Sequence, residues 1–411
     1  MTTTPPPHTV TPRRILIVAE AVTLAHAVRP AVMAGLLGRA GHQVTLAWAP
    51  RYASLFPELD CPTETIDSLA PADFAAALAA GRPIYSAARL LDYVAADEAL
   101  LERLRPDVVM GDFRLSLQVS ARRARVPYLG ITNAYWSPWA RQAVPVPDIL
   151  PTRLLGARLM QPIFDRVRPL AFAQHARPIE AMRRRHGLPA LGGDLFAAYT
   201  EADQVLYADI PGLVDLSGLP ANHHVAGPVL WSPSGSLPQW WDGLSDDQPL
   251  VYVTLGSSGD PRTLPALLAA LGRLRVRVLL ASAGKALPDR LPANVLTADY
   301  LPGLAASARA CLVVCNGGAP TTQQALAAGR PVLGICTNLD QQLNMQGIVR
   351  AGAGLSLRAS EASGARLSRA LDHLLADGPH HAAAWQLAAR CAEADLAGTL
   401  QAAIEDALAA H

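Results

Sequence analysis

Residues 311–344 read CLVVCNGGAPTTQQALAAGRPVLGICTNLDQQLN, and this order of residue types indicates an α/β unit. The run CLVV is short, apolar and rich in β-branched residues, which is typical of a strand buried on both faces. Asn316, Gly317 and Gly318 then turn the chain, and the Ala- and Leu-rich segment that follows favours a helix that stops at Gly329. The next run, VLGIC, predicts a second buried strand.

A glycine turn that leads into a helix is chemically suited to phosphate. The first N–H groups of a helix lack partners within it, and the helix dipole places partial positive charge at the same end. Such turns are also common as plain links between a strand and a helix, so the turn alone leaves both interpretations open. The loop after the second strand favours a ligand site, because open α/β sheets bind ligands at the carboxyl ends of their strands. Its polar residues are Asn338, Asp340, Gln341, Gln342 and Asn344.

Strand-like apolar runs alternate with helical patterns along nearly the whole chain. This alternation predicts an α/β fold with parallel sheets covered by helices. Residues 230–249 are rich in Ser, Pro, Gly and Asp and separate two series of such units, so they form the best linker in the sequence. The predicted strands lie at 15–19, 44–48, 107–111, 127–131, 204–208, 250–256, 277–281, 311–314 and 331–335.

Length and composition fit a protein of more than one domain without a highly charged partner. The 411 residues exceed one ordinary domain, and an apolar content of 51% can fill two cores. A formal net charge of +1 gives no electrostatic reason to expect nucleic acid as a partner. Five scattered cysteines indicate a reducing cytosol, and we expect neither a signal peptide nor a transmembrane segment. We therefore expect a cytoplasmic protein.

The stretch 311–344 resembles the donor-binding signature of the GT-B glycosyltransferases of the UDP-glycosyltransferase and macrolide-glycosyltransferase type. That signature usually reads like HGGxGTxxEALAxGxPxxxxPxxxDQxxN. Two positions depart from it: Asn316 stands in place of a histidine that contacts the α-phosphate of the donor, and Gln324 in place of a glutamate that holds the ribose. Both replacements can still form hydrogen bonds. The positions that match in order and spacing are Gly317, Gly318, Thr322, Ala325, Leu326, Gly329, Pro331, Asp340, Gln341 and Asn344.

The resemblance implies two Rossmann-like domains whose parallel sheets face each other across a cleft. Residues 1–230 would form the acceptor-binding domain, 231–249 the linker, and 250–395 the domain that binds a nucleotide-diphosphate sugar. Residues 396–411 would form a helix that packs back on the N-terminal domain. The donor would be a UDP- or dTDP-sugar, which is a co-substrate, so we expect no resident cofactor.

Further donor contacts follow from the same resemblance. The loop Gly256, Ser257 and Ser258 is similar to a loop in which a serine contacts phosphate, although a plain strand-to-helix turn has the same composition. Tyr300 either stacks on the nucleotide base, as an aromatic residue does in the family, or is a half-buried tyrosine at a sheet edge. Leu301 would offer backbone groups to the base. The other predicted donor-site residues are Asn316, Gly317, Gly318, Ala319, Thr321, Thr322, Gln324, Asp340 and Gln341.

The first half of the chain holds the predicted catalytic pair. His26 follows the first strand and precedes a helix that ends in Gly41 and His42, as the catalytic base does in the resembling family, although Ala25 replaces the usual glycine. Asp112 ends the strand DVVMG and is the predicted partner, because a carboxylate fixes the tautomer of a histidine and stabilises its charged form. A histidine at a helix start is also often structural, and a strand-terminal aspartate often only caps a helix.

These residues predict inverting transfer of a sugar to a hydroxyl group. His26 would remove the hydroxyl proton, Asp112 would orient the ring, and the glycine turn would stabilise the leaving nucleoside diphosphate. The sequence contains no DxD motif, so we expect no metal site. Tyr135, Trp136 and Trp139 either line an apolar pocket for a small lipophilic acceptor or belong to the core.

Two other functions stay open at this point. A nucleotide-sugar epimerase of the same fold would not need the pair formed by His26 and Asp112. A binding protein that kept the fold and lost turnover would tolerate the departures at Ala25, Asn316 and Gln324. Neither alternative accounts for His26 and Asp112 together as directly as catalysis does.

Overall fold

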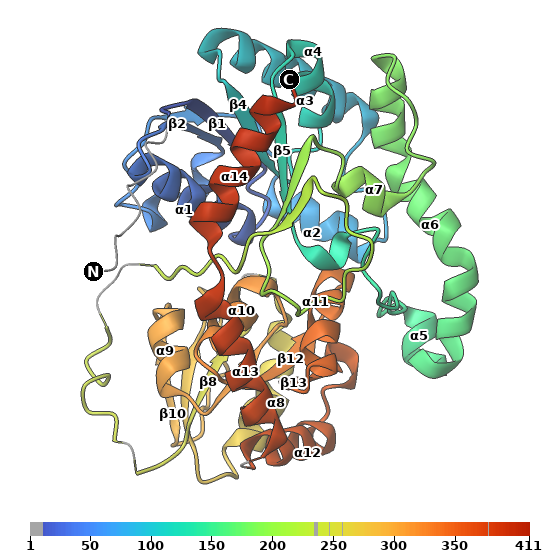
Figure 1. Ribbon diagram of the computed structural model, residues 1–411. Coiled ribbons are helices and arrows are strands. Elements are labelled where there is room, and N and C mark those ends of the chain that lie inside the picture. Colours follow the sequence, from blue (N-terminus) through green and yellow to red (C-terminus); the bar gives the residue numbers. More distant parts are fainter. Residues whose placement is uncertain (1–10, 234–236, 246, 257, 377) are drawn as a thin grey trace.

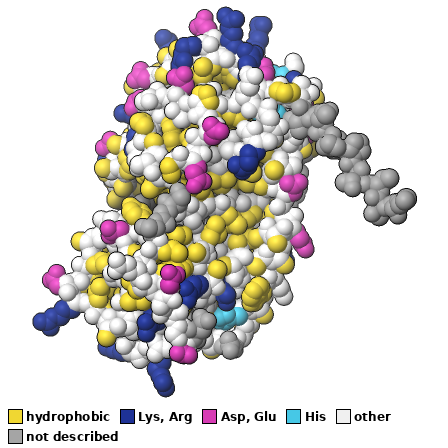
Figure 2. Space-filling view, turned by 90° about the vertical axis from the view of Figure 1, so that its left-hand side faces the viewer, with side chains coloured by type: hydrophobic (Ala, Val, Ile, Leu, Met, Phe, Trp, Pro, Cys, Tyr) yellow, Lys and Arg dark blue, Asp and Glu magenta, His cyan; other side chains and the backbone are white. Residues whose placement is uncertain are grey.

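The computed structural model describes residues 11–233, 237–245, 247–256, 258–376 and 378–411 and places them in two stacked α/β domains (Figure 1). Each domain is built around one parallel sheet. On the face shown in Figure 2, hydrophobic side chains are visible across the middle of the molecule, whereas Lys and Arg are most prominent at its two ends. The two parallel sheets confirm the predicted α/β architecture.

The N-terminal sheet has seven parallel strands in the order β3-β2-β1-β4-β5-β6-β7. Both of its faces are buried: Ile15 and Ile17 on β1 face one hydrophobic cluster, and Leu16 and Val18 face another. This two-sided burial explains why the strands are continuous apolar runs. The strands are β1 (Arg14–Ala19), β2 (Gln43–Trp48), β3 (Thr63–Thr65), β4 (Val108–Asp112), β5 (Tyr128–Thr132), β6 (Gln204–Tyr207) and β7 (His223–Val225).

Helices cover both faces of this sheet. The helix α1 and the C-terminal helix α14 pack in one cluster, and α3 and α4 pack in the other. The helices are α1 (Ala25–Arg39), α2 (Pro71–Ala79), α3 (Ala87–Leu104), α4 (Leu117–Ala124), α5 (Leu150–Leu155), α6 (Ala157–Arg185) and α7 (Leu195–Tyr199), with short 3₁₀ turns η1 (Pro50–Leu55) and η2 (Ala134–Trp136).

The C-terminal sheet has six parallel strands in the order β10-β9-β8-β11-β12-β13. The predicted strand, helix and strand of residues 311–344 are β11, α10 and β12. The strands are β8 (Leu250–Thr254), β9 (Arg277–Ala281), β10 (Val295–Ala298), β11 (Leu312–Cys315), β12 (Val332–Cys336) and β13 (Gly354–Arg358). The helices are α8 (Leu264–Leu271), α9 (Gly303–Arg309), α10 (Ala319–Ala327), α11 (Leu339–Arg350), α12 (Gly364–Leu375) and α13 (Pro379–Glu393), with η3 (Pro261–Thr263) and η4 (Ala359–Glu361). Across the described ranges, we find no helix with the length and apolar content that a membrane crossing requires.

The domains are joined by two connections that touch each other. A Cβ atom on Gly227, which follows β7, would lie 2.8 Å from Cβ of Ala394, which leads from α13 into α14 (Leu396–Ala409). Beyond this contact, α14 packs against α1 and the strands β4 to β7 of the N-terminal domain. Part of the predicted linker 231–249 is packed on the C-terminal domain, because Trp241 and Leu244 are buried in its core.

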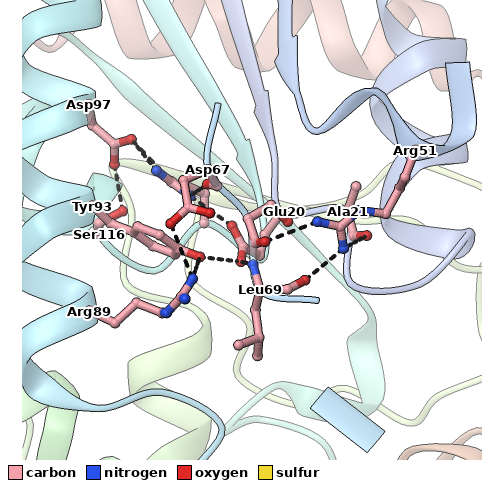
Figure 3. A network of polar contacts seen from close by, with 11 residues as sticks. Glu20, Ala21, Arg51, Asp67, Leu69, Arg89, Tyr93, Asp97 and Ser116 are labelled. Atoms are coloured by element: carbon pink, nitrogen blue, oxygen red, sulfur yellow. Dashed lines mark hydrogen bonds and ion pairs between the residues drawn. The ribbon is translucent and has the colours of Figure 1, made fainter. Parts of the chain in front are cut away.

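A buried network of charged groups holds the carboxyl ends of β1 and β4 (Figure 3). Arg114, just beyond β4, donates from Nη1 to Glu20 Oε2 (2.8 Å) and from Nε to Asp97 Oδ1 (3.0 Å). All three side chains are at most 1% exposed. Glu20, just beyond β1, also accepts hydrogen bonds from the Leu69 N–H (2.8 Å) and the Tyr93 hydroxyl (3.1 Å). The network therefore fixes the edge of the sheet at which the predicted catalytic residues lie.

Replacing Arg114 with alanine is expected to leave Glu20 and Asp97 buried without a counter-charge. Removing one partner from a buried ion pair costs about 3–5 kcal/mol. Urea titration at neutral pH should show a loss of this size in the free energy of unfolding of Arg114→Ala. The matched control is Arg123→Ala, whose partner Glu98 lies at the surface, and it should lose much less. Equal losses in the two variants would contradict the role of the network.

Candidate active site

The predicted catalytic pair meets at the carboxyl edge of the N-terminal sheet. His26 lies in the first turn of α1, and Asp112 is the last residue of β4. His26 Nδ1 is 2.6 Å from Asp112 Oδ1, with the aspartate side chain 0% and the histidine side chain 18% exposed. We assign the ring proton to Nδ1, because an ionised carboxylate only accepts hydrogen bonds. The second ring nitrogen, Nε2, is then the one that can take a proton.

Arg29, which the sequence analysis did not single out, completes this pair. It donates from Nε to Asp112 Oδ2 (2.7 Å) and from Nη2 to Asp112 Oδ1 (2.9 Å). Burial acts to raise the pKa of Asp112, but the charges of Arg29 and His26 outweigh burial and hold that pKa below its ordinary value. The carboxylate therefore stays ionised inside the protein. The three-residue spacing of His26 and Arg29 was a usable signal, because it places both side chains on one face of a helix.

Phe113 positions the ring of His26 from the other side. The two rings stack with their centroids 4.9 Å apart and an angle of 22° between their planes. Phe113 has φ = 57°, a left-handed conformation that is uncommon for a bulky residue. Such strained residues cluster at active sites, where the surrounding structure holds them in place. The sequence signal for Phe113 was only its position directly after Asp112.

A chain of buried polar groups leads from this pair into the C-terminal domain. Arg29 Nη1 donates to Asn133 Oδ1 (2.5 Å), and Asn133 Nδ2 donates to Asp209 Oδ1 (3.0 Å). Gln323 Nε2, from α10 of the other domain, donates to the Ala208 carbonyl (2.7 Å) and reaches Asp209 Oδ1 (3.3 Å). Burial raises the pKa of Asp209 to about 6, although the hydrogen bonds that it accepts oppose this rise. The two domains thus share one polar path.

The predicted glycine turn is a rigid cradle at the start of α10. Gly317 has φ = +81°, and a Cβ atom there would lie 2.8 Å from both Cys336 Sγ and Met345 Cγ. Asn316 shapes the turn from within, because its Oδ1 accepts a hydrogen bond from the Gly318 N–H (3.1 Å). The departure from the family histidine therefore supplies a group that bonds to the turn itself.

Several predicted donor residues around this cradle form hydrogen bonds with other protein groups or are buried. Thr322 is fully buried, donates to the Ala319 carbonyl (3.1 Å), and accepts a hydrogen bond from Asn344 Nδ2 (2.9 Å). Gln324 Nε2 donates to the carbonyl of Trp231 in the connection between the domains. Ala319 begins α10, and its side chain is buried. Thr321, another predicted donor residue in the first turn of α10, has a partly exposed side chain.

A second loop closes over the cradle. The Ser258 hydroxyl accepts hydrogen bonds from Asn316 Nδ2 (2.9 Å) and Gln341 Nε2 (3.2 Å). Gly256 has φ = +55°, and a Cβ atom there would lie 3.7 Å from Asn316 Nδ2. Ser257, also predicted to contact the donor, lies outside the described residues. The structure therefore brings Ser258, Asn316 and Gln341 together, as expected for one binding site.

Asp340 faces the N-terminal domain across the junction. It lies in the first turn of α11 and accepts a hydrogen bond from Trp136 Nε1 (2.8 Å). Tyr135 is 2% exposed, and burial together with the nearby charges of Asp340 and Asp209 raises the pKa of its hydroxyl well above the ordinary value. A predicted donor residue and two predicted acceptor residues therefore meet at one point.

Tyr300 and Leu301 follow the edge strand β10 and have different surroundings. The Tyr300 side chain is 54% exposed, which leaves its ring available for stacking. Leu301 is 4% exposed and belongs to the core of the C-terminal domain, so only its backbone can serve a ligand. Burial raises the pKa of Tyr52 in the N-terminal domain, and nearby Tyr300 adds to this rise, so Tyr300 lies beside the domain junction.

An aromatic wall extends from the catalytic pair to helix α6. Neighbouring ring centroids along it are 5.2–5.6 Å apart. Of the five residues in this wall, only Trp136 was predicted from the sequence, because the other four come from separate elements that pack together in the fold. Trp139 lies apart from this wall, with its ring against His223 on the edge strand β7. The aromatic wall consists of Phe113, Tyr199, Trp136, Phe196 and Phe172.

Several solved structures that align with nearly the whole chain are glycosyltransferases. The spinosyn rhamnosyltransferase SpnG aligns with a TM-score of 0.69 at 21% identity, over 95% of this chain and 100% of that chain. The glycosyltransferase VinC, solved in complex with dTDP, aligns with a TM-score of 0.66 at 20% identity, over 96% of this chain and 99% of that chain. The chain therefore has the GT-B fold of these enzymes.

Sequence relatives give the family. The PGL/p-HBAD biosynthesis rhamnosyltransferase of Mycobacterium bovis is 48% identical over 376 residues, which are 92% of this chain and 84% of that protein. A Mycobacterium bovis protein named an inactive PGL/p-HBAD biosynthesis glycosyltransferase is 47% identical over 261 residues, which are 64% of this chain and 71% of that protein. Residues 265–399 also match the C-terminal domain of the erythromycin biosynthesis protein CIII-like family. The chain belongs to the family of the PGL/p-HBAD biosynthesis glycosyltransferases.

The cradle is expected to depend on the missing side chain at Gly317. In Gly317→Ala the new Cβ would meet Cys336 and Met345 at 2.8 Å in a backbone conformation that alanine rarely adopts. Overpacking of this kind costs about 1–3 kcal/mol, which thermal unfolding would detect. The matched control is Gly364→Ala, at a helix start with open space around the Cβ, and it should not lose stability. An unchanged melting temperature for Gly317→Ala would show that the turn is not rigid.

Proposed function

We propose that the protein is an inverting, metal-independent glycosyltransferase that moves a sugar from a UDP- or dTDP-sugar to a hydroxyl group of a small lipophilic acceptor. One observation carries this proposal: His26 Nδ1 is held 2.6 Å from a buried carboxylate, which leaves Nε2 as a base at the carboxyl edge of the sheet. The cradle at Gly317 lies in the facing domain, where it would hold the leaving group. The absence of a DxD motif fits a reaction without a bridging metal.

The catalytic step places a proton on His26. As the acceptor oxygen attacks the anomeric carbon, Nε2 takes the hydroxyl proton and the bond between that carbon and the phosphate oxygen breaks. The attack comes from the face opposite the leaving group, so the configuration inverts. Asp112 stabilises the imidazolium that forms, and Arg29 keeps Asp112 ionised throughout. A positioned base of this kind contributes roughly 10²–10⁴ in rate.

The leaving diphosphate would bind at the start of α10. Both polar atoms of the Asn316 side chain already have protein partners. Oδ1 accepts a hydrogen bond from the Gly318 N–H, and Nδ2 donates one to the Ser258 hydroxyl. Asn316 therefore supports the site through the turn that it shapes. The phosphate charge is then balanced by backbone N–H groups and the helix dipole. The exposed ring of Tyr300 would stack on the base, and the hydroxyl of Thr321 would add a hydrogen bond.

The acceptor side favours an apolar molecule. The five rings of the aromatic wall are each partly exposed, and an apolar lining of this kind suits a lipophilic aglycone. The relatives at 47–48% identity carry names that place them in PGL/p-HBAD biosynthesis, which supports an acceptor in glycolipid formation. Several are named rhamnosyltransferases, so rhamnose is the first sugar to test.

We place this reaction in the cytoplasm, where thiols stay reduced. Cys315 and Cys336 are buried at the ends of the neighbouring strands β11 and β12. Burial raises the pKa of each thiol to about 12. Both thiols therefore stay protonated and act as small apolar side chains of the core.

A binding protein without turnover is the second candidate, because one relative is named inactive. That candidate predicts binding of a nucleotide sugar without product for any acceptor. An epimerase would convert the donor without an acceptor. The complete contact set of His26, Arg29 and Asp112 favours transfer over both, since neither binding nor isomerisation needs a histidine base held by a buried carboxylate.

The first test concerns the base. His26→Ala should lower the turnover number by about 10²–10⁴ while the nucleotide dissociation constant stays nearly unchanged, because His26 lies in the domain opposite the cradle. Product chromatography and isothermal titration with UDP and dTDP measure the two quantities. His373→Ala, at an exposed position on α12, is the matched control and should keep full turnover. Full turnover in His26→Ala would exclude it as the base.

The second test concerns the donor sugar. Asp340→Ala should weaken binding of the nucleotide sugar by about tenfold or more, because it removes hydrogen bonds that the sugar hydroxyls would donate to its carboxylate. Binding of the bare nucleotide should change little. Titration of both ligands against Asp340→Ala, with Asp372→Ala as an exposed control on α12, separates these effects. Equal losses for the two ligands would place Asp340 away from the sugar.

A further inference from the structure

Helices α5 and α6 form an arm with an apolar outer surface. In Figure 1, α6 runs along the outer side of the N-terminal domain, and α5 lies at the end of α6 away from the sheet. Of the thirteen large hydrophobic side chains that are exposed in the described residues, eight lie between residues 149 and 170, and they are 47–76% exposed. We call them the outer stripe: Ile149, Leu150, Leu154, Leu155, Leu159, Ile163, Val167 and Leu170.

The outer stripe follows the helical repeat. Leu159, Ile163 and Val167 are four residues apart, so they lie on one face of α6. A neighbouring face, about 100° around the helix, already has its partners, because Phe164 is 8% exposed and packs in a cluster with Met160. Since α6 packs on the domain through this other face, the outer stripe is not needed for the fold of the domain. Contiguous apolar surface of this kind marks an interaction site.

The charges around the outer stripe indicate its partner. Arg158 and Arg166 are exposed, Arg168 is partly exposed, and no ion pair joins these arginines to an acid within the described ranges. The one acidic residue between them, Asp165, accepts a hydrogen bond from Gln161 (2.9 Å). An apolar stripe flanked by arginines matches the boundary between the headgroups and acyl chains of an anionic bilayer. A second copy fits less well, because a two-fold contact on this face would bring its own arginines together.

The aromatic wall ends on the same helix. Phe172 lies on α6 and forms the last ring of the wall, with its centroid 5.5 Å from that of Phe196. It packs in the same cluster as Phe164, on the inner side of the helix. The wall continues through Trp136 and Tyr199 to Phe113, which stacks on His26. Docking of α6 on a bilayer would therefore bring the end of the wall close to the membrane surface.

We propose that the outer stripe docks on the surface of an anionic lipid bilayer and that the aromatic wall receives the acceptor from it. The docking stands on the exposed surface and its charges. The delivery of the acceptor rests on the proposed transferase function.

Vesicle binding by the full chain tests the docking. Sedimentation with vesicles of phosphatidylcholine and phosphatidylglycerol in equal amounts should bind the protein, and added salt should weaken this binding. The combined variant Leu159→Gln, Ile163→Gln and Val167→Gln should bind these vesicles about tenfold more weakly or worse, since each apolar side chain contributes to insertion. The matched control replaces three exposed apolar residues outside the arm: Leu78→Gln, Leu237→Gln and Val349→Gln. Equal losses in the stripe variant and this control would overturn the proposal.

A second pair of variants tests the charge. Arg158→Gln with Arg166→Gln should remove most of the preference for phosphatidylglycerol over phosphatidylcholine vesicles. Arg273→Gln with Arg275→Gln, two exposed arginines of the other domain, is the matched control and should keep that preference. Preference that survives in the Arg158 and Arg166 variant would overturn the electrostatic part of the proposal.

Activity and association state separate the remaining outcomes. If the stripe variant turns over a water-soluble acceptor normally but has lost lipid-borne acceptor in vesicles, docking and delivery are both supported. If vesicle binding depends on the outer stripe while no acceptor is ever glycosylated, docking stands and the transferase function fails. If the wild type does not bind vesicles and sedimentation velocity shows a dimer that the stripe variant breaks, the outer stripe is an interface between two copies and docking is overturned.

Discussion

The site depends on the interaction of the buried Asp112 carboxylate with His26 and Arg29. A charge removed from water is costly unless it is paired and hydrogen-bonded. His26 and Arg29 supply these partners from one face of α1, so pairing the charge also fixes the rotation of that helix against β4. Phe113 then closes the other side of the ring in a strained backbone conformation. Stability of the domain and orientation of the His26 ring have the same physical origin.

The same carboxylate begins a path of polar contacts that ends in the other domain. From Arg29 it passes through Asn133 to Asp209, which Gln323 approaches from α10. Separating the domains would break the hydrogen bonds from Gln323 to the Ala208 carbonyl and to Asp209. A buried polar group that loses its partner raises the free energy of the protein. His26 and the glycine turn at Gly317 are therefore held in fixed relative positions, together with the two connections that touch at Gly227.

The sequence predicted the fold well, but it gave few side-chain directions. Strands, turns and caps depend on neighbours in the chain, so residues 311–344 could be interpreted as a strand, a cradle and a helix. A matched motif, however, gives proximity and not orientation. Thr322 bonds inside the protein, and Trp139 packs on an edge strand. Asn316, which departs from the family pattern, bonds to the turn beside it.

By itself, the sequence determined two α/β units and the placement of His26 and Asp112 at the carboxyl ends of strands, because periodicity and turn chemistry act locally. Only the tertiary structure decided that Arg29 grips that aspartate and that scattered aromatic residues form one wall. It also decided that the outer stripe on α6 faces away from the core. These contacts join residues far apart in the chain, so they depend on strand register and on how helices pack, which no local pattern encodes.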